Sequence, residues 1–169
     1  HPDLLKAIKS GTNGAIAVTL VEWSDEAHQV VNFPWRRLAG PDDLEAFASE
    51  LSIAPRLVPG GETAIGEAIV FALAQFDGSG FDSARRVIDV SGDGASNRGR
   101  PTEDARDEAM RGGVVINGLT ILDEEPDVAD FYRANVIGGS GSFILTARDY
   151  NDFADAILRK LVREVQFIS

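Results

Sequence analysis

The sequence predicts one α/β domain with a doubly wound, mostly parallel, Rossmann-like sheet and one antiparallel edge strand. Apolar, β-branched segments alternate with amphipathic helical segments along most of the chain. The connection between the first two strands is short, which indicates a hairpin, whereas helices separate the later strands. No linker, internal repeat or change of composition divides the 169 residues, a length that suits one domain. We therefore expect residues 1–169 to fold as a single unit.

The first half of the chain is predicted to hold one helix, a hairpin and two further helices. Pro34 removes a backbone donor from the hairpin, so its second strand belongs at a sheet edge. Thr63 precedes the longer of the two later helices, and we expect it to be the N-cap. The expected elements are a helix at 3–9, strands at 15–23 and 29–35, a helix from 41 that Pro55 closes, and a helix from 63 to about 76.

The second half repeats a strand–loop–helix order. Strands that alternate with helices imply right-handed crossovers, with helices on both faces of the sheet. Such sheets bind ligands beyond the carboxyl ends of their strands, and the loops at 58–63 and 91–97 are candidates for that end. The expected elements are strands at 86–90, 114–122 and 142–146, helices at 102–111 and near 128–135, and a last helix capped by Asp149 or Asn151.

Composition limits the classes of function. Twenty-seven acidic residues against 16 basic ones give a formal charge of −11, which argues against nucleic acid and anionic lipid as partners. The chain has no cysteine, so disulfides, thiolate metal sites and cysteine nucleophiles are excluded. No apolar run approaches the roughly 20 residues of a membrane span. We expect a protein that binds no nucleic acid and does not span a membrane.

Polar side chains gather in the loop at 91–97. Ser91 and Asp93 stand there among glycines, and Thr63 belongs to a loop expected at the same end of the sheet. Hydroxyl and carboxylate oxygens are ligands that Mg²⁺ and Ca²⁺ prefer. The sequence therefore allows a divalent-cation site at Thr63, Ser91 and Asp93. The alternative is an ordinary strand-to-helix turn built from common turn residues.

Other chemistries fit these residues poorly. The loop lacks the third glycine of a dinucleotide fingerprint, and Asp93 beneath a pyrophosphate would be repulsive. Ser91 is not in a nucleophile elbow, and only His1 and His28 are available as a base, so a Ser–His–Asp triad is not indicated. Asp89 is expected to be a half-buried carboxylate that needs a partner, with Arg85 or the next residue as the candidate.

The order of elements resembles a von Willebrand factor type A (vWA) domain, and more closely an uncharacterised bacterial branch of that superfamily. The resemblance covers nearly the whole chain, and the order and spacing of its motifs carry it rather than any one motif. The stretches that carry it are Thr63-Ala64-Ile65-Gly66, Val87 to Gly94, Ile116-Asn117-Gly118-Leu119, Asn97-Arg98-Gly99, Tyr132, Val136-Ile137-Gly138-Gly139 and the helix from Phe153 to Val165.

The resemblance implies a metal-ion-dependent adhesion site at the carboxyl end of the sheet. In that family the cation is held by a DxSxS motif after the first strand, a Thr and an Asp; Thr63 and Asp93 match the last two. A carboxylate from a protein partner often completes the metal shell, so the implied function is protein binding rather than catalysis. The resemblance also implies a periplasmic or extracellular location.

The chain departs from the family in one respect. It contains no DxSxS, and the strand that carries this motif would lie upstream of His1. That strand is central in the family's order, between the strands at 15–23 and 86–90, so we expect a gap there and a partial or vestigial cation site. In an alternative registration, Asp89, Ser91 and Asp93 form a DxSxD motif and face the metal together.

Three hypotheses follow from the sequence. The leading one is a protein-binding module of the adhesion type, with a partial site for Mg²⁺ or a similar divalent cation. The second is a metal-free structural α/β interaction domain, motivated by the missing DxSxS motif. The third, an enzyme that uses the same crevice, has only the polar residues in its favour, because no nucleophile and base are evident.

Overall fold

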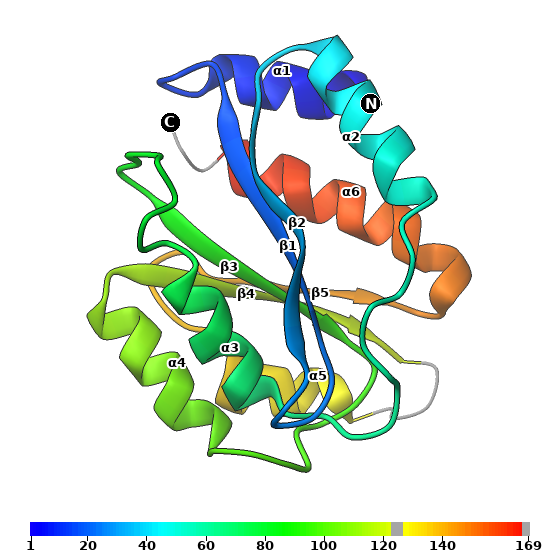
Figure 1. The fold of residues 1–169 in the computed structure, drawn as a ribbon, viewed down its shortest axis with the longest axis vertical. Helices are drawn as coiled ribbons and strands as arrows, with labels where there is room; N and C mark the ends of the chain where they lie inside the picture. Colours follow the sequence, from blue (N-terminus) through cyan, green and yellow to red (C-terminus); the bar gives the residue numbers. More distant parts are fainter. Residues whose placement is uncertain (123–126, 167–169) are drawn as a thin grey trace.

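The structure is a computed structural model that describes residues 1–122 and 127–166. Helices and strands alternate as the sequence predicts (Figure 1). The elements are α1 (Pro2–Ser10), β1 (Ile16–Trp23), β2 (Gln29–Leu38), α2 (Pro41–Ser52), α3 (Ile65–Ala74), β3 (Arg86–Gly92), α4 (Thr102–Arg111), β4 (Val114–Ile121), α5 (Val128–Phe131), the π-helix η1 (Tyr132–Val136), β5 (Ile144–Ala147) and α6 (Tyr150–Gln166).

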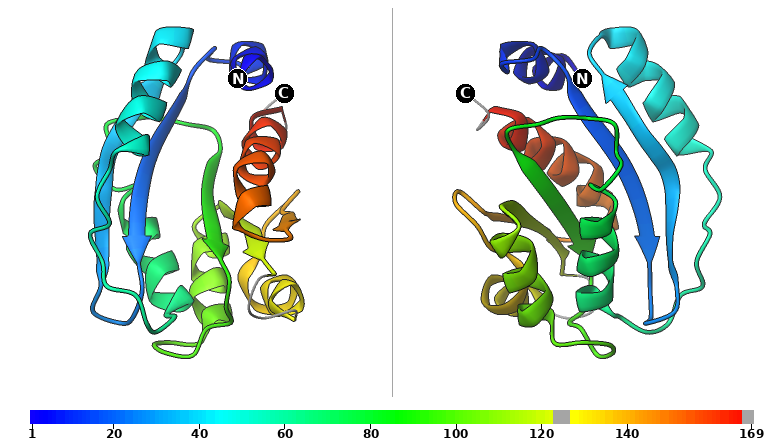
Figure 2. Two further views of the ribbon diagram at one scale, coloured as in Figure 1. Left: turned by 90° about the vertical axis from the view of Figure 1, so that its right-hand side faces the viewer. Right: turned by 60° about the vertical axis from the view of Figure 1, so that its left-hand side comes forward.

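The strands form two separate groups in the described part of the chain. β1 and β2 pair antiparallel, and β3, β4 and β5 form a parallel sheet in that order. The α/β class, the parallel sheet and the antiparallel hairpin are thus confirmed. Figure 2 shows the hairpin standing apart from β3, which is the place where the sequence predicts a gap.

Helices cover both faces of the parallel sheet because its side chains alternate between them. On one face, Ile88 and Ile116 pack against α3, α4 and α5, around Ile65 and Tyr132. On the other face, side chains of β4 and β5 pack against α6; this cluster consists of Leu119, Ile121, Ala147 and Ala156. The core therefore has two layers, one on each side of the sheet.

The first and last helices pack against each other. Ala7, Ile8 and Val165 are buried together, with Ile16 at the start of β1 packed against them (Figure 1). α1 therefore lies beside α6 and leads directly into β1. This contact joins the hairpin to the face of the parallel sheet that α6 covers.

Several boundaries differ from the sequence predictions. Thr63 is not the N-cap of α3: the cap position is Ala64, and no side chain caps it. A bond from the Ala64 amide to the Ser24 carbonyl, at 2.7 Å, holds the entry to the helix instead. The short helix predicted near residues 128–135 exists but ends as the π-helix η1. Asp149 caps the last helix, because its carboxylate accepts from the amides of residues 151 and 152.

Candidate functional site

A cavity of about 730 Å³ lies at the carboxyl ends of β1 and β3. Thr63 lines it from the loop before α3, and Ser91 and Asp93 line it from the end of β3. The structure therefore brings together the three residues that the sequence singles out. Their role as cation ligands stays a prediction. The facing wall comes from Leu20 to Ser24 of the first hairpin.

Hydrogen bonds to the backbone of Thr63 hold this residue in position and do not involve its hydroxyl. Its amide donates to Asn97 Oδ1 at 2.9 Å, and its carbonyl accepts from the Asn97 amide at 2.9 Å. Ser96 Oγ donates to the same carbonyl at 3.2 Å and accepts from the Ile65 amide at 3.2 Å. The Thr63 hydroxyl makes no hydrogen bond to the described residues. These hydrogen bonds therefore hold the two loops together. They leave the Thr63 hydroxyl oxygen available as a ligand.

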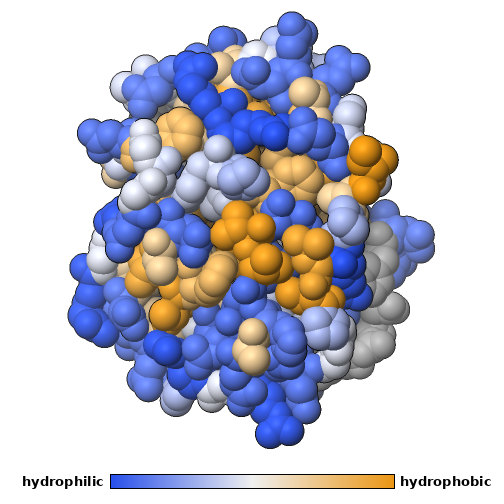
Figure 3. Space-filling model, viewed as in Figure 1, coloured by the Kyte–Doolittle hydropathy of each residue, from blue (hydrophilic) through white to orange (hydrophobic). Residues whose placement is uncertain are grey.

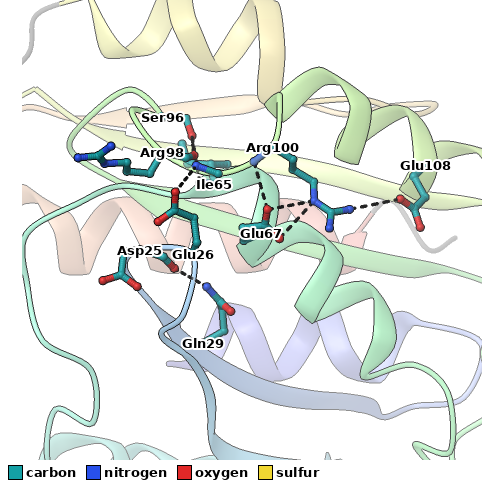
Figure 4. A network of polar contacts seen from close by, with 10 residues as sticks. Asp25, Glu26, Gln29, Ile65, Glu67, Ser96, Arg98, Arg100 and Glu108 are labelled. Carbon is teal, nitrogen blue, oxygen red and sulfur yellow. Dashed lines mark hydrogen bonds and ion pairs between the residues drawn. The ribbon is translucent and has the colours of Figure 1, made fainter.

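A network of charged side chains holds the far side of these loops (Figure 4). Arg100 contacts Glu67 of α3 at 3.2 Å, and its guanidinium reaches Glu108 of α4 at 3.9 Å. Glu26, in the turn of the hairpin, accepts from the Gly99 amide at 3.2 Å. The loop after β3 is thus fixed to α3, α4 and the hairpin together.

A buried tyrosine lies directly beneath the end of β3. Tyr132 is fully buried, and its hydroxyl has no hydrogen-bond partner among the described residues. Two glycines make room for it: a Cβ at Gly92 would meet its hydroxyl at 2.7 Å, and one at Gly118 would meet its ring at 2.9 Å. Burial, with a smaller effect from the negative charge of Asp93, raises the pKa of Tyr132 well above its usual value. The phenol therefore stays protonated next to the loop that carries Asp93.

Another buried polar atom without a partner belongs to Ser24, which, unlike Tyr132, is among the residues that line the cavity. Ser24 is 7% exposed, and its Oγ makes no hydrogen bond to the described residues. Neither Ser24 nor Tyr132 was a candidate site residue at the sequence level. A serine after a strand and a tyrosine in a mixed helical segment match no site motif, so only the structure shows that their hydroxyls are buried without partners.

Asp89 does not join the cavity, so the registration of Asp89, Ser91 and Asp93 as one motif is wrong. Its carboxylate pairs with Lys160 of α6 on the opposite face of the sheet. The expectation that Arg85 or its neighbour would pair with Asp89 is also wrong. Lys160 is 1% exposed, and Glu164 and Asn117 are buried beside it. Asp89 lies within β3, two residues before Ser91, and its carboxylate meets Lys160 of α6 instead of the cavity at the end of the strand.

The residues that line the cavity provide hydroxyl and carboxylate oxygens as possible metal ligands. The residues described as lining it include no histidine, and His28 pairs instead with Asp25 at 2.7 Å in the hairpin turn. Within residues 1–122 and 127–166, no three acidic or histidine side chains gather as a metal-binding group. The described helices include none that is long and apolar enough to cross a membrane.

The family model described as "Protein of unknown function (DUF1194)" matches residues 1–169, the whole of the chain. The chain belongs to the DUF1194 family. A comparison with curated protein sequences gives no match for this DUF1194 domain.

Solved structures of a mussel protein have a similar fold. Proximal thread matrix protein 1 of the mussel byssus matches with a TM-score of 0.64 and 16% identity, over 98% of this chain and 42% of its own. A structure of the same protein "with zinc occupied MIDAS motif" matches with a TM-score of 0.59 and 14% identity, over 87% of this chain and 34% of its own. The DUF1194 domain thus spans less than half of these proteins. Its fold is vWA-like, as the sequence predicts.

Proposed function

We propose that this DUF1194 domain is a protein-interaction module of the adhesion type, with a weak divalent-cation site at the carboxyl end of β3. The observation that carries the proposal is the convergence of Thr63, Ser91 and Asp93 on one cavity. Their hydroxyl and carboxylate oxygens suit Mg²⁺, which takes few protein ligands and keeps several waters. The cation would hold a carboxylate of the partner protein, as the vWA resemblance implies.

The surroundings of the cavity support a polar or charged ligand. The hydroxyls of Ser24 and Tyr132 are buried without hydrogen-bond partners in the described structure, and buried polar groups are seldom left so. The Tyr132 phenol, held protonated, is a donor suited to a carboxylate or to a water bound to a metal. The formal charge of −11 favours cations over anions near the protein.

The comparison with the mussel protein supports the same interpretation. That protein has a zinc-occupied MIDAS motif in one structure, and its fold matches most of the present chain. We infer binding rather than catalysis, because the lining residues described here offer no paired nucleophile and base. A periplasmic or extracellular location agrees with a thread matrix protein as structural neighbour.

Manganese binding, measured by electron paramagnetic resonance of the free ion, tests the cation site. We expect the wild type to bind Mn²⁺, and Mg²⁺ to compete for it. Asp93→Asn and Thr63→Ala are each expected to weaken binding at least about tenfold, because each removes one ligand from a sparse shell. Thr63→Ser, which keeps the hydroxyl, should bind like the wild type. Asp82→Asn, an equal change of charge on an exposed loop residue, is the matched control.

Two outcomes would contradict the cation site. If all variants bind Mn²⁺ equally, the ion is held by surface charge elsewhere. If the wild type does not bind, and a chelator leaves its thermal midpoint unchanged, the metal-free interaction domain is the better description. Turnover of hydrolase or phosphatase substrates that is lost in Asp93→Asn would favour an enzyme that uses the same crevice.

A further inference from the structure

The hydroxyl of Ser24 is buried at the wall of the cavity and has no hydrogen-bond partner in the described structure. Ser24 is 7% exposed and lines the cavity just after the carboxyl end of β1, and its Oγ bonds to none of the described residues. Buried polar side chains nearly always have a partner. The open oxygen therefore indicates a ligand that the described residues do not supply.

The backbone of Ser24 is held on both sides without help from the side chain. Its amide donates to the His28 carbonyl at 3.0 Å, and its carbonyl accepts from the Ala64 amide at 2.7 Å. Two residues further on, Glu26 accepts from the Gly99 amide at 3.2 Å (Figure 4). The turn is therefore fixed to α3 and to the loop after β3 by contacts that do not need the hydroxyl.

Two contacts place Ser24 beside the residues of the proposed cation site. The bond from the Ala64 amide to the Ser24 carbonyl brings Ser24 next to Thr63, the residue before Ala64. A Cβ at Gly92 would lie 3.9 Å from two ring atoms of Trp23, so the residue before Ser24 reaches the end of β3. The two residues on either side of Gly92 are the other proposed ligands. The end of β1 thus lies against both loops that supply the site.

The other carboxylates of the lining already have partners. Apart from the proposed ligand of β3, the described lining residues with a carboxylate are Glu22 and Glu62. Glu22 Oε2 accepts from the Leu57 amide at 2.8 Å, and Glu62 pairs with Arg98 at 3.2 Å. Ser24 is therefore the residue at the end of β1 whose side-chain oxygen is open to a ligand.

We propose that Ser24 Oγ is a further ligand of the divalent cation at Thr63, Ser91 and Asp93, an inference that rests on the cation site of the proposed function. A serine hydroxyl is a hard, neutral oxygen donor, which suits Mg²⁺ and Mn²⁺. Ser24 follows β1, whereas Ser91 and Asp93 stand at the end of β3, and these two strands belong to separate groups in the described structure. The bound cation therefore joins the hairpin to the parallel sheet.

Manganese binding by Ser24 variants tests the inference, with the electron paramagnetic resonance of the free ion as the readout. Ser24→Ala is expected to weaken Mn²⁺ binding at least about fivefold, because it removes one oxygen from a sparse shell. With chelator present, its thermal midpoint should equal that of the wild type, because the hydroxyl has no partner to lose. Ser49→Ala, at an exposed serine of α2, is the matched control and should bind like the wild type.

Ser24→Cys separates direct ligation from a structural role. A thiolate is a soft ligand that favours Cd²⁺ over Mn²⁺. We expect this variant to bind Mn²⁺ weakly and Cd²⁺ at least about tenfold more tightly than the wild type, with a thiolate-to-cadmium absorption band in the ultraviolet. The chain has no cysteine of its own, so the band reports on this thiol alone. Ser49→Cys, which places the thiol away from the cavity, should gain neither property.

The outcomes distinguish this inference from the proposed function. Mn²⁺ binding that is equal in Ser24→Ala and the wild type, but lost in Asp93→Asn, overturns the role of Ser24 and leaves the cation site in place. A Ser24→Cys variant that binds Cd²⁺ no better than Ser49→Cys overturns direct ligation. A lower midpoint of Ser24→Ala in chelator assigns the hydroxyl a structural role instead. A wild type that binds no Mn²⁺ overturns the proposed cation site and this inference with it.

Discussion

Glu164 provides a test of the buried charges beneath the parallel sheet. Burial, followed by the hydrogen bond and negative charge of Asp89, raises the pKa of Glu164 from 4.5 to about 8. Lys160 and Asn117 act in the opposite direction with smaller effects. Arg85 also contacts this group of side chains, through the Glu164 carbonyl. Glu164 is therefore protonated in the folded chain at neutral pH.

The direction of the pH effect follows from linkage. In the unfolded chain Glu164 ionises near 4.5, whereas in the folded chain it keeps its proton to about pH 8. The stability that the raised pKa of Glu164 contributes is fully present below pH 4.5 and is lost as the pH rises to about 8. One pKa unit corresponds to about 1.4 kcal/mol, so the loss is on the order of 3–5 kcal/mol.

Glu164→Gln removes the titration and keeps a neutral side chain of the same shape. Urea unfolding gives the free energy of unfolding of both proteins at each pH. We expect the variant's value minus the wild type's to increase by a few kcal/mol from pH 5 to pH 8. Glu103→Gln, the same substitution at an exposed position in the first turn of α4, should show no such growth. A difference between Glu164→Gln and the wild type that stays constant across this range would refute the assignment of a buried, protonated Glu164.

Three further changes test the packing around the site and the core. Gly66→Ala places a Cβ 2.7 Å from the Arg100 carbonyl oxygen and should lower the thermal midpoint, at a cost of about 1–3 kcal/mol; an unchanged midpoint would contradict the close approach. Trp35→Phe loses the 2.8 Å bond from Nε1 to the Gln75 carbonyl and should cost about 1 kcal/mol in chemical denaturation. Ile69→Ala, in the core, should cost about 2–5 kcal/mol, whereas Ile53→Ala, 83% exposed, should stay within about 0.5 kcal/mol.

One face of the molecule exposes a group of apolar side chains. Figure 3 shows apolar side chains gathered across the middle of one face, with hydrophilic residues around them. Leu51, Ile53 and Leu57 are among the exposed large apolar residues, and Leu51 also lines the cavity.

Local patterns predicted most of the fold because they depend on neighbouring residues. The helix at 102–111 and the parallel strands follow from apolar spacing and from glycines that end the elements. The sequence also predicts that Thr63 and Asp93 lie at one end of the sheet, because each stands in a loop that leads into a helix, and both residues line the cavity there. The prediction that Thr63 caps α3 was wrong because the start of the helix is held by a bond from the Ala64 amide to the Ser24 carbonyl. Ser24 is remote in the sequence, so local patterns do not reveal this contact.

The sequence by itself determined the α/β class, the order of the elements, the acidic surface and the loops that meet at the carboxyl end of β3. Only the tertiary structure decided which buried polar groups face one another. It placed Lys160 rather than an arginine against Asp89, set Tyr132 beneath two glycines, and left the edges of β1 and β3 unpaired among the described strands. The physical reason is that periodicity reports which face of an element is buried, whereas a partner across the core depends on how separate elements pack.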